Sequence, residues 1–443
     1  MGGLRGTCMR SLIGIRRENK NKWERRVPLI PEHLKKLREK QGVTSIVQPS
    51  QIRAFLDKKF SEAGATVQND LLACPIVFAV KEIPIDFFEP GKTYVFFSHT
   101  IKGQKHNMPM LKRMMDLGCT LIDYEKIVDN QGRRLLFFGR FAGLAGMVDT
   151  LWAFGQRLQW ENIDTPFNDI KQTIQYKDLE DIKEQVARIG KKIAAHGLPQ
   201  SLTPLIVGFA GYGNVYKGTQ EIIDLLPVQE LAPHEIESVF KNPSHNSVYK
   251  VVFKEKHMVE PISSDDTFDL QEYYQHPENY RSVFETYLPH LTILMNCIYW
   301  DKQYPRLVTK AYLKQSFAQK NRLRLRVIGD ISCDINGAIE CTEKETTPDN
   351  PVFVYHPLSD EITDGYAGDG VVIMAVDNLP CELPRESSQA FSTTLSRFIP
   401  DLANADFSEE NFDALQLPPE IKNAIIVYHG KLTPNYQYIA KYL

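Results

Sequence analysis

Ionisable residues follow two apolar runs near the start of the chain, where they could take part in proton transfer. Lys81 comes directly after the run 76–80, and His99 follows the run 94–97 with Lys102 three residues later. Because the carboxyl ends of parallel strands meet at one edge of a sheet, we expect these three side chains to converge on one crevice. Histidine and lysine are suited to general acid–base catalysis. The alternative for each is an ordinary solvated side chain after a strand.

A basic loop follows the first apolar run of the chain and indicates an anionic substrate. The cationic residues of this loop include Arg16, Arg17, Lys20, Arg25 and Arg26. A guanidinium group matches a carboxylate bidentately, so this composition favours carboxylate binding. The alternative is a solvated surface loop.

A glycine-rich turn in the middle of the chain predicts a dinucleotide site. An apolar run, 205–210, leads into a turn and then into a helix expected over 218–226; the turn comprises Gly211, Tyr212, Gly213, Asn214 and Val215. Glycines allow a tight turn and let a pyrophosphate approach the backbone at the start of the helix. Tyr216 replaces the third glycine of the usual fingerprint, and the alternative is a plain strand–helix turn.

Polar residues at further strand ends are expected near the same cofactor. The run 228–231 is the next strand expected, and it places Glu230 seventeen residues after Gly213. That is about where an acid binds the adenosine ribose in a Rossmann unit. Expected strands over 324–331 and 370–376 bring four more candidates to this edge, namely Asp330, Asp334, Asp377 and Asn378.

Short strands alternating with helices predict an α/β fold. We expect a strand over 135–139 (LLFFG) and then a long buried helix, 141–158, that joins two domains. The fold class expected is two Rossmann-like domains with parallel sheets, with the C-terminal segment returning to the first domain. The expected boundaries are 1–140 plus 381–443 for a substrate-binding domain and 141–380 for a dinucleotide-binding domain.

Composition narrows the class of protein. The 443 residues carry a formal charge of −3, which gives no reason to expect a nucleic-acid partner, and no apolar run is long enough to cross a membrane. Seven cysteines without a CxxC pair favour reduced thiols, as in the cytoplasm or, alternatively, the mitochondrial matrix. Eleven histidines without paired metal-ligand spacing predict no metal site.

Several longer segments are similar to one enzyme family. They include ENKNKWERRVPLIP, VKEIP, FFSHTIKGQ, LIDYEKIVDNQGRRLLFFG, GYGNVYKG, IYWDKQYPRLVT, GDISCDINGAIE and VDNLP, and they run from about residue 12 to the C-terminus. The chain resembles the lysine-ketoglutarate reductase domain of aminoadipic semialdehyde synthase, within the superfamily of saccharopine dehydrogenase and alanine dehydrogenase. No saccharopine-oxidising half follows, so a monofunctional form working with a separate saccharopine-oxidising enzyme is expected.

The resemblance implies a reaction and a role for each matching residue. Family members condense L-lysine with 2-oxoglutarate and reduce the imine to saccharopine with a nicotinamide hydride. By position, Lys81 and His99 match the acid–base pair, and Arg26 and Arg134 match residues that hold substrate carboxylates. Four residues match the surroundings of the substrate: Glu82, Lys102, Gln104 and Glu125. The glycine turn, Asp330, Asp334, Asp377 and Asn378 match dinucleotide contacts.

The cofactor and two rival functions stay open at this point. The family resemblance favours NADPH, whereas a carboxylate such as Glu230 at the ribose favours NADH. The first rival is an NAD-dependent, lysine-forming saccharopine dehydrogenase, and the second is a non-catalytic dinucleotide-sensing protein. A simple alanine dehydrogenase fits less well, because the extra arginines imply a larger anionic substrate. The oligomeric state is left open.

Overall fold

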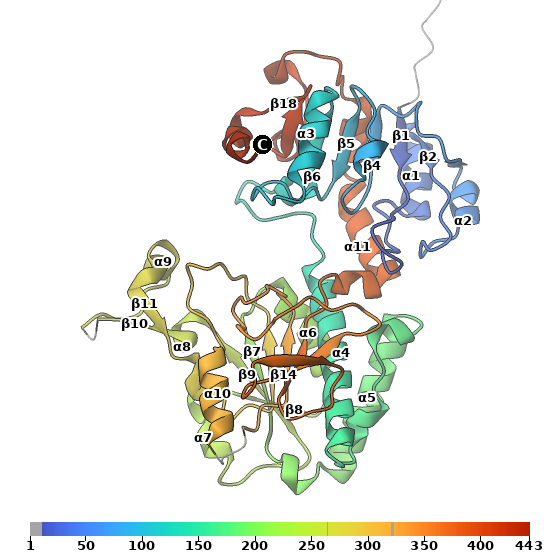
Figure 1. The fold of residues 1–443 in the computed structure, drawn as a ribbon. Coiled ribbons are helices and arrows are strands. Elements are labelled where there is room, and N and C mark those ends of the chain that lie inside the picture. The colour runs from blue at the N-terminus through green and yellow to red at the C-terminus, as the bar shows by residue number, and fades with distance from the viewer. Residues whose placement is uncertain (1–10, 264, 320–322) are drawn as a thin grey trace, which may run out of the picture. The chain divides into compact units, whose positions relative to one another are not determined.

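The computed structural model of the chain describes residues 11–263, 265–319 and 323–443. The chain divides into two compact units: Met1–Phe138 with Pro384–Leu443, and Gly139–Leu383. Each unit contains an eight-stranded sheet with helices packed against it (Figure 1). The predicted α/β class with two Rossmann-like domains is confirmed, and each sheet is parallel except at one edge.

The first sheet has the order β18-β17-β6-β5-β4-β1-β2-β3. Its parallel part runs from β6 to β3, and the buried strands at its centre explain the continuous apolar runs in the sequence. Its strands are β1 (Leu12–Ile15), β2 (Thr44–Val47), β3 (Thr66–Val67), β4 (Ile76–Phe78), β5 (Thr93–Phe96), β6 (Thr120–Asp123), β17 (Ile425–Tyr428) and β18 (Lys431–Leu432). The helices of this unit include α1 (Pro31–Gln41), α2 (Asp57–Glu62), α3 (Met108–Asp116), α11 (Pro384–Leu395), α12 (Ile399–Asn404) and α13 (Pro419–Lys422).

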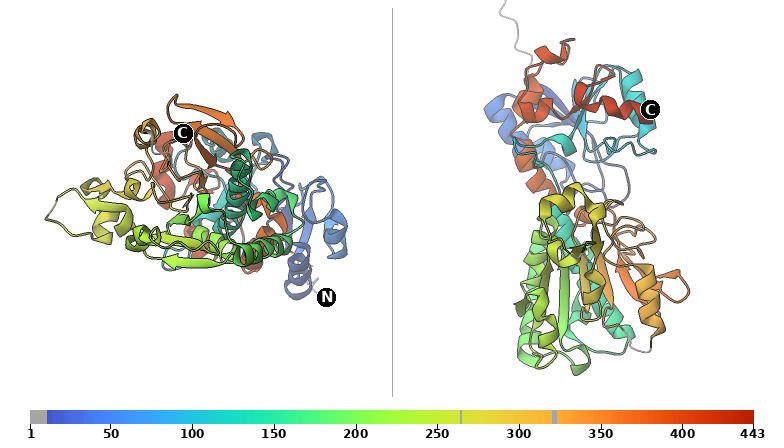
Figure 2. Two further views of the ribbon diagram at one scale, coloured as in Figure 1. Left: turned by 90° about the horizontal axis from the view of Figure 1, so that it is seen from below. Right: turned by 90° about the vertical axis from the view of Figure 1, so that its left-hand side faces the viewer.

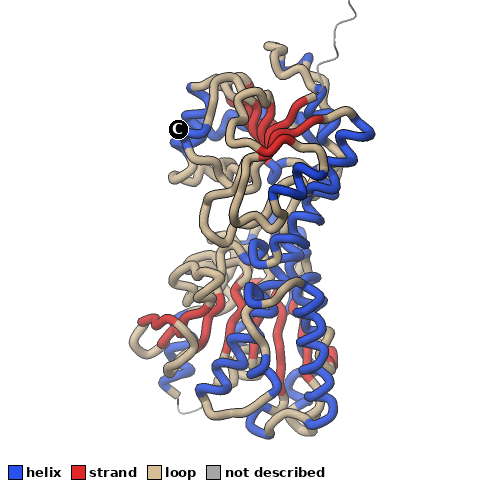
Figure 3. Tube along the Cα trace, turned by 90° about the vertical axis from the view of Figure 1, so that its right-hand side faces the viewer, coloured by secondary structure: helices blue, strands red, loops and turns tan. Residues whose placement is uncertain are grey.

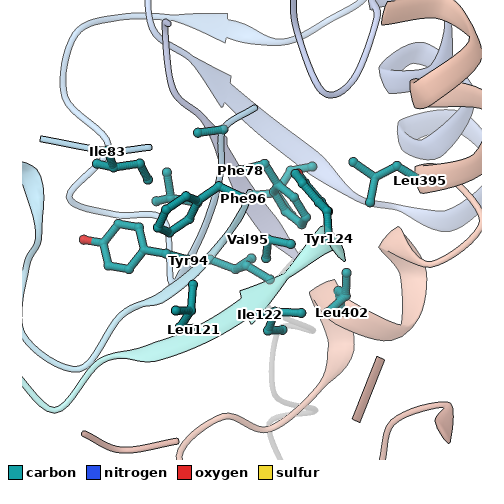
Figure 4. Close-up of a cluster of buried hydrophobic side chains, with 14 of the residues drawn as sticks. Phe78, Ile83, Tyr94, Val95, Phe96, Leu121, Ile122, Tyr124, Leu395 and Leu402 are labelled. Atoms are coloured by element: carbon teal, nitrogen blue, oxygen red, sulfur yellow. The ribbon is translucent and has the colours of Figure 1, made fainter. Parts of the chain in front are cut away.

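The C-terminal segment completes the first unit. β17 pairs antiparallel with β6, and the backbone N–H of Val27 donates a hydrogen bond to Ser388 Oγ at 3.0 Å. Figure 4 shows Leu395 and Leu402, from α11 and α12, beside buried side chains of the sheet such as Phe96. The expected return of the chain is therefore confirmed, and it contributes both a strand and core side chains to the sheet.

The second sheet has the order β15-β14-β16-β13-β12-β7-β9-β8. It is parallel from β8 to β16, and β14 and β15 are antiparallel. Its strands are β7 (Leu205–Ala210), β8 (Val228–Leu231), β9 (Val248–Phe253), β12 (Ile293–Asn296), β13 (Val327–Asp330), β14 (Val352–His356), β15 (Glu361–Asp364) and β16 (Val371–Met374). Its longer helices are α4 (Gly139–Trp160), α5 (Leu179–His196), α6 (Asn214–Ile223) and α10 (Lys310–Ala318). The unit also contains α7 (Ile236–Val239) and α8 (Glu255–Met258).

Helices cover both faces of the second sheet. Ile328 of β13 belongs to the core cluster that includes Leu313 of α10. The neighbouring residue, Gly329, faces the other way, and a Cβ there would lie 2.3 Å from Thr150 Oγ1 of α4. Figures 1 and 2 show α10 on one side of these strands and α5 on the other, and Figure 3 shows the strands in red with the helices beside them.

Three features differ from the sequence-based expectations. The segment LLFFG (135–139) is not a strand: the nearest bridge among the described residues is at Arg134, the residue before it, which pairs with Val128, and α4 already begins at Gly139. The helix expected from Gly218 begins four residues earlier, at Asn214, directly after the glycine turn. Strand β9 was not predicted, and it lies between β7 and β8. In each case long-range pairing or packing outweighs the local pattern.

Two glycines let α4 and α6 pack with their backbones nearly in contact. A Cβ at Gly143 would lie 1.9 Å from the carbonyl oxygen of Val215, and a Cβ at Gly218 would lie 2.0 Å from that of Arg140. Any larger side chain at either position would push the helices apart. This packing fixes α6 and, with it, the turn at its N-terminus.

Two carboxyl groups lie buried together between α4 and the segment before α11. The charges of Asp149 and Glu382 interact, both side chains are buried, and among the described residues neither Glu382 oxygen nor Asp149 Oδ2 has a hydrogen-bond partner. Burial raises the pKa of Asp149 to about 6, and burial together with the charge of Asp149 raises the pKa of Glu382 well above its ordinary value. The pair must therefore hold a proton at a pH where both groups would be ionised in water.

No helix formed by the described residues is long and apolar enough to cross a membrane.

We expect Glu382→Gln to make the stability of the second unit less dependent on pH. The raised pKa values mean that the folded state holds more protons than the unfolded chain, so wild-type stability falls as the pH rises through about 6. The glutamine amide can donate to Asp149 without taking up a proton. The variant should therefore gain about 1–3 kcal/mol relative to the wild type between pH 5 and pH 8, at up to about 1.4 kcal/mol per pH unit for each proton.

Urea unfolding at pH 5, 6.5 and 8 would measure this difference. Glu184→Gln, on the exposed face of α5, is the matched control and should leave the pH dependence unchanged. Parallel pH profiles for the wild type and Glu382→Gln would contradict the shared proton.

Candidate functional site

Segments that follow β1, β4 and β5 bring three ionisable side chains into contact in the first unit. His99 Nδ1 lies 2.5 Å from Glu82 Oε1, and Lys20 Nζ lies 3.1 Å from Glu82 Oε2. Burial raises the pKa of Glu82, but the hydrogen bond from His99 and the charges of His99, Lys20 and Lys81 outweigh it, so the pKa lies below its ordinary value. Glu82 is therefore an anion that orients the imidazole.

The contact with Glu82 selects the imidazole nitrogen that can exchange a proton. When Nδ1–H donates to the carboxylate, the neutral ring carries its lone pair on Nε2. The backbone of His99 has φ +49°, a left-handed conformation that is uncommon for residues other than glycine. Asn107 Nδ2 donates to the carbonyl oxygen of His99 at 3.2 Å and helps to hold this conformation. A conformation that costs energy at an ionisable residue points to a functional role.

Glu18 fixes the backbone that carries Lys81. Its two carboxyl oxygens accept hydrogen bonds from the backbone N–H groups of Val80 at 2.7 Å and Lys81 at 3.0 Å. Burial raises the pKa of Glu18 to about 7, and the nearby Glu24 adds to this, whereas the two N–H groups and Arg16 oppose it. The basic loop after β1 thus contributes a buried acid to the site, which the sequence analysis missed because it considered only the cations of that loop.

Asp123 joins the ends of β5 and β6. Its carboxylate accepts hydrogen bonds from Ser98 N at 3.1 Å, from Ser98 Oγ and from Glu125 N at 2.8 Å. Burial raises the pKa of Asp123. Asp123 was also missed as a site residue, although the sequence shows it directly after the apolar pair Leu121 and Ile122.

The predicted carboxylate-binding arginines lie in different surroundings. Arg26 is buried and forms two hydrogen bonds with Glu24, from Nε at 2.8 Å and from the terminal nitrogen at 2.5 Å, with its guanidinium 4.3 Å from the centre of the Phe138 ring. Arg134 forms an ion pair with Glu125, and its side chain is 50% exposed. Arg134 is thus the more accessible of the two for a substrate carboxylate.

Lys102 and Gln104 lie in a turn after β5 that the C-terminal segment covers. The hydroxyl of Tyr438 donates to the carbonyl oxygen of Ile101 at 2.8 Å. Gly103 has φ +67°, and a Cβ there would lie 2.4 Å from the ring of Tyr442. The C-terminal segment therefore restrains the turn that carries two predicted substrate-binding residues.

The second unit contains the predicted glycine turn between β7 and α6. Gly211 has φ +96°, and its N–H donates to the carbonyl oxygen of Phe253 at 3.1 Å. A Cβ at Gly213 would meet no atom within 4 Å, so the turn is open at the residue directly before α6. An open space before a helix N-terminus fits a dinucleotide pyrophosphate. Tyr216, in place of the third glycine, packs edge-on against Phe209.

The other predicted cofactor residues are distributed over two strand ends and one edge strand. Asp330 is buried and accepts hydrogen bonds from Asn296 Nδ2 at 2.8 Å and Thr342 Oγ1 at 2.6 Å, so it also braces the ends of β12 and β13. Asp334, Asp377 and Asn378 follow β13 and β16. Glu230 lies on the edge strand β8, where Lys250 Nζ is 3.4 Å from its Oε2. Their roles toward a cofactor stay predictions. The described residues contain no group of three or more potential metal ligands.

Models of two protein-family domains match parts of the chain. The model of the alanine dehydrogenase/PNT N-terminal domain matches residues 14–145, and the model of the alanine dehydrogenase/PNT C-terminal domain matches residues 281–435. These two stretches of the chain are similar to the two domains of the alanine dehydrogenase/PNT family. The first match contains the Lys81–His99 region, and the second contains β12 to β17.

Among individual proteins, the chain is similar to α-aminoadipic semialdehyde synthases. It is 38% identical to the Arabidopsis thaliana protein over 97% of this chain and 41% of that protein. It is 35% identical to the Mus musculus protein, whose name includes "mitochondrial", over 99% of this chain and 48% of that protein. The chain thus spans less than half the length of these relatives. It is also 26% identical to the saccharopine dehydrogenase [NAD(+), L-lysine-forming] of Yarrowia lipolytica, over 84% of this chain and 87% of that one.

Solved structures share the fold at low identity. An L-alanine dehydrogenase superposes with a TM-score of 0.61 at 18% identity, covering 97% of this chain and 99% of that one. A transhydrogenase from Sinorhizobium meliloti gives a TM-score of 0.53 at 15% identity, covering 95% of this chain and all of that one. These structures agree with the two-domain α/β architecture.

We expect Gly103→Ala to disturb the turn of Lys102 and Gln104 more than backbone strain alone would. Gly91→Ala is the matched control, because Gly91 has a similar φ of +73° but open space around it. A left-handed alanine costs roughly 1–2 kcal/mol, and Gly103→Ala adds the collision with Tyr442. Thermal unfolding of the variants should therefore give a lower Tm for Gly103→Ala than for Gly91→Ala.

Replacing Tyr442 by alanine in the Gly103→Ala background should remove the collision and bring the Tm close to that of Gly91→Ala. An equal loss in Gly103→Ala and Gly91→Ala would show that the C-terminal segment does not restrain this turn.

Proposed function

We propose that the chain is a lysine-ketoglutarate reductase, which condenses the ε-amine of L-lysine with 2-oxoglutarate and reduces the resulting imine to saccharopine. The observation that carries this proposal is the contact of His99 and Lys20 with Glu82 beside Lys81, at the positions that match the family's acid–base pair. The similarity to α-aminoadipic semialdehyde synthases over nearly the whole of this chain supports it.

The residues of the first unit can perform the proton transfers of such a condensation. Addition of an amine to a ketone gives a carbinolamine, which must gain a proton on its hydroxyl to leave as water and form the imine. His99, oriented through Nδ1, can deliver or accept that proton at Nε2. Lys81 can serve as the second acid–base group, with its backbone held by Glu18.

The cationic residues suit the carboxylates of the substrates. Lysine brings one carboxylate and 2-oxoglutarate brings two, so three negative charges require partners. Arg134, Lys102 and Arg26 are proposed to hold them, and the bidentate geometry of arginine would fix the orientation of the substrates. When bound, the nicotinamide supplies the hydride that reduces the imine. The turn at Gly211–Gly213 and the N-terminus of α6 would hold its dinucleotide.

NADPH is proposed as the reductant, from the resemblance to the reductase domain, with NADH as the alternative. A second candidate function is the NAD-dependent, lysine-forming saccharopine dehydrogenase reaction, which the similarity to the Yarrowia lipolytica protein favours. Initial rates of saccharopine formation with each nucleotide distinguish the two. A strong preference for NADH would favour the second candidate.

Lys81→Ala and His99→Ala should each lower kcat for saccharopine formation by roughly 10²–10⁴-fold, the usual contribution of a positioned acid–base group. Lys112→Ala on α3 and His196→Ala on α5 are matched controls, because both side chains are exposed. They should retain the wild-type rate. If the first two variants are folded and keep turnover within about threefold, the acid–base assignment is wrong.

A further inference from the structure

The second unit contains an aromatic cavity beside the glycine turn. Its volume is about 420 Å³, and its lining includes Gly211 and Gly213. Six aromatic side chains also line it: Tyr212, Tyr273, Tyr274, Tyr299, Trp300 and Tyr304. Flat aromatic faces in a pocket of this size suit a planar, stacking ligand group such as a purine base.

The wall of this cavity includes part of an excursion from the nucleotide-binding fold. The excursion contains β10 (Val259–Pro261) and β11 (Tyr280–Ser282), which pair antiparallel, and the short helix α9 (Leu270–Gln275). Tyr273 of α9 packs with its ring 5.4 Å from that of Tyr304, and this contact holds the excursion against the segment after β12. The cavity is thus formed by residues of the second unit alone.

Strand order determines which acid lies beside the glycine turn. β9 is the neighbour of β7, with Ala210 opposite Phe253, and the N–H of Gly211 donates to the carbonyl oxygen of Phe253. Glu255 therefore follows the strand end that touches the turn, and it lines the cavity. Glu230 is on β8, where it lies opposite Lys250 of β9. One whole strand separates it from the turn.

Two tyrosine hydroxyls hold the Glu255 carboxylate. Tyr212, from the turn itself, donates to Oε2 at 3.1 Å, and Tyr274, from α9, donates to Oε1 at 2.8 Å. Lys254 is exposed, with its Nζ 5.6 Å from the centre of the Tyr212 ring. Glu255 thus lines the cavity, and its neighbour in the chain, Lys254, lies close to Tyr212, which also lines it. The two residues carry opposite charges and would respond in opposite directions to a charged group on the ligand.

We infer that this cavity takes the adenosine half of the dinucleotide, and that Glu255 with Lys254, and not Glu230, determines the choice between a 2′-hydroxyl and a 2′-phosphate on its ribose. The inference rests on the proposed use of a nicotinamide dinucleotide. A carboxylate beside the 2′ position accepts a hydrogen bond from the hydroxyl and repels the phosphate, whereas the neighbouring ammonium group attracts the phosphate.

Binding of two adenosine fragments tests this inference on the full chain. AMP carries the 2′-hydroxyl, and adenosine 2′,5′-bisphosphate carries the 2′-phosphate. Titration calorimetry gives the Kd of each, and the ratio of the two Kd values measures discrimination. Glu255→Gln should shift this ratio toward the bisphosphate by roughly tenfold, because one like-charge contact is removed at a partly exposed position. Lys254→Ala should shift the ratio toward AMP.

Two control variants distinguish binding of adenosine in the cavity from discrimination between the two fragments. Glu230→Gln changes the same chemical group on the edge strand and should leave the ratio within about twofold of the wild type. Tyr299→Ala removes an aromatic wall and should weaken both fragments by roughly tenfold with the ratio unchanged, since stacking does not depend on the 2′ group. Thermal unfolding shows whether each variant is folded. If Glu255→Gln does not fold, Lys254→Ala still tests whether this pair of residues determines the ratio.

A change of ratio in Glu230→Gln with none in Glu255→Gln or Lys254→Ala would overturn the inference. So would binding of both fragments that Tyr299→Ala leaves unchanged. The fragments contain no nicotinamide and the titration contains no lysine or 2-oxoglutarate. A failure to form saccharopine would therefore count against the proposed function alone, and the fragment titrations would still decide the role of Glu255.

Discussion

The candidate substrate site depends on two carboxylates buried at the carboxyl edge of the first sheet. Glu18 accepts the backbone N–H groups of Val80 and Lys81, and Asp123 accepts those of Ser98 and Glu125. Loop backbone at a strand end has no ladder partner, so a side chain or water must accept its hydrogen bonds. These two acids supply that partner and hold the chain where Lys81 and His99 leave the sheet.

Burying these acids has an electrostatic cost that shapes the site. Removal from water disfavours the charged carboxylate, which is why the pKa of Glu18 lies at about 7 despite two backbone N–H donors. Glu82 has the opposite balance, because His99, Lys20 and Lys81 together stabilise its anion. Two glutamates at the carboxyl edge of one sheet thus have pKa values shifted in opposite directions, and shifted pKa values are typical of functional sites.

Local sequence patterns predicted most of the buried parallel strands, because a strand covered on both faces is a continuous apolar run. The pattern failed where the outcome depends on partners far along the chain. LLFFG is apolar and looks like a strand, yet it runs into α4 at Gly139 and forms no bridge with any described residue; the nearest bridge is at Arg134, the residue before it. Glu18 was hidden for a different reason: in a loop of many cations, nothing in the residue type reveals that its side chain points inward.

The second unit shows why a glycine motif and a residue spacing do not by themselves identify the residues of a nucleotide site. The glycine turn is local, and the structure places it between β7 and α6 as the sequence suggested. The acid that we propose for the ribose is not local, because it would belong to whichever strand pairs with β7. Sequence order would make that strand β8, but β9 lies in between, and its residues Val248–Phe253 pair with all six residues of β7. A spacing counted along the chain assumes that consecutive strands are neighbours. Here β9, a later strand, lies next to β7, so the same spacing leads to the edge strand β8. Which acid lies beside the glycine turn can then be found only from the hydrogen-bonded pairing of the strands.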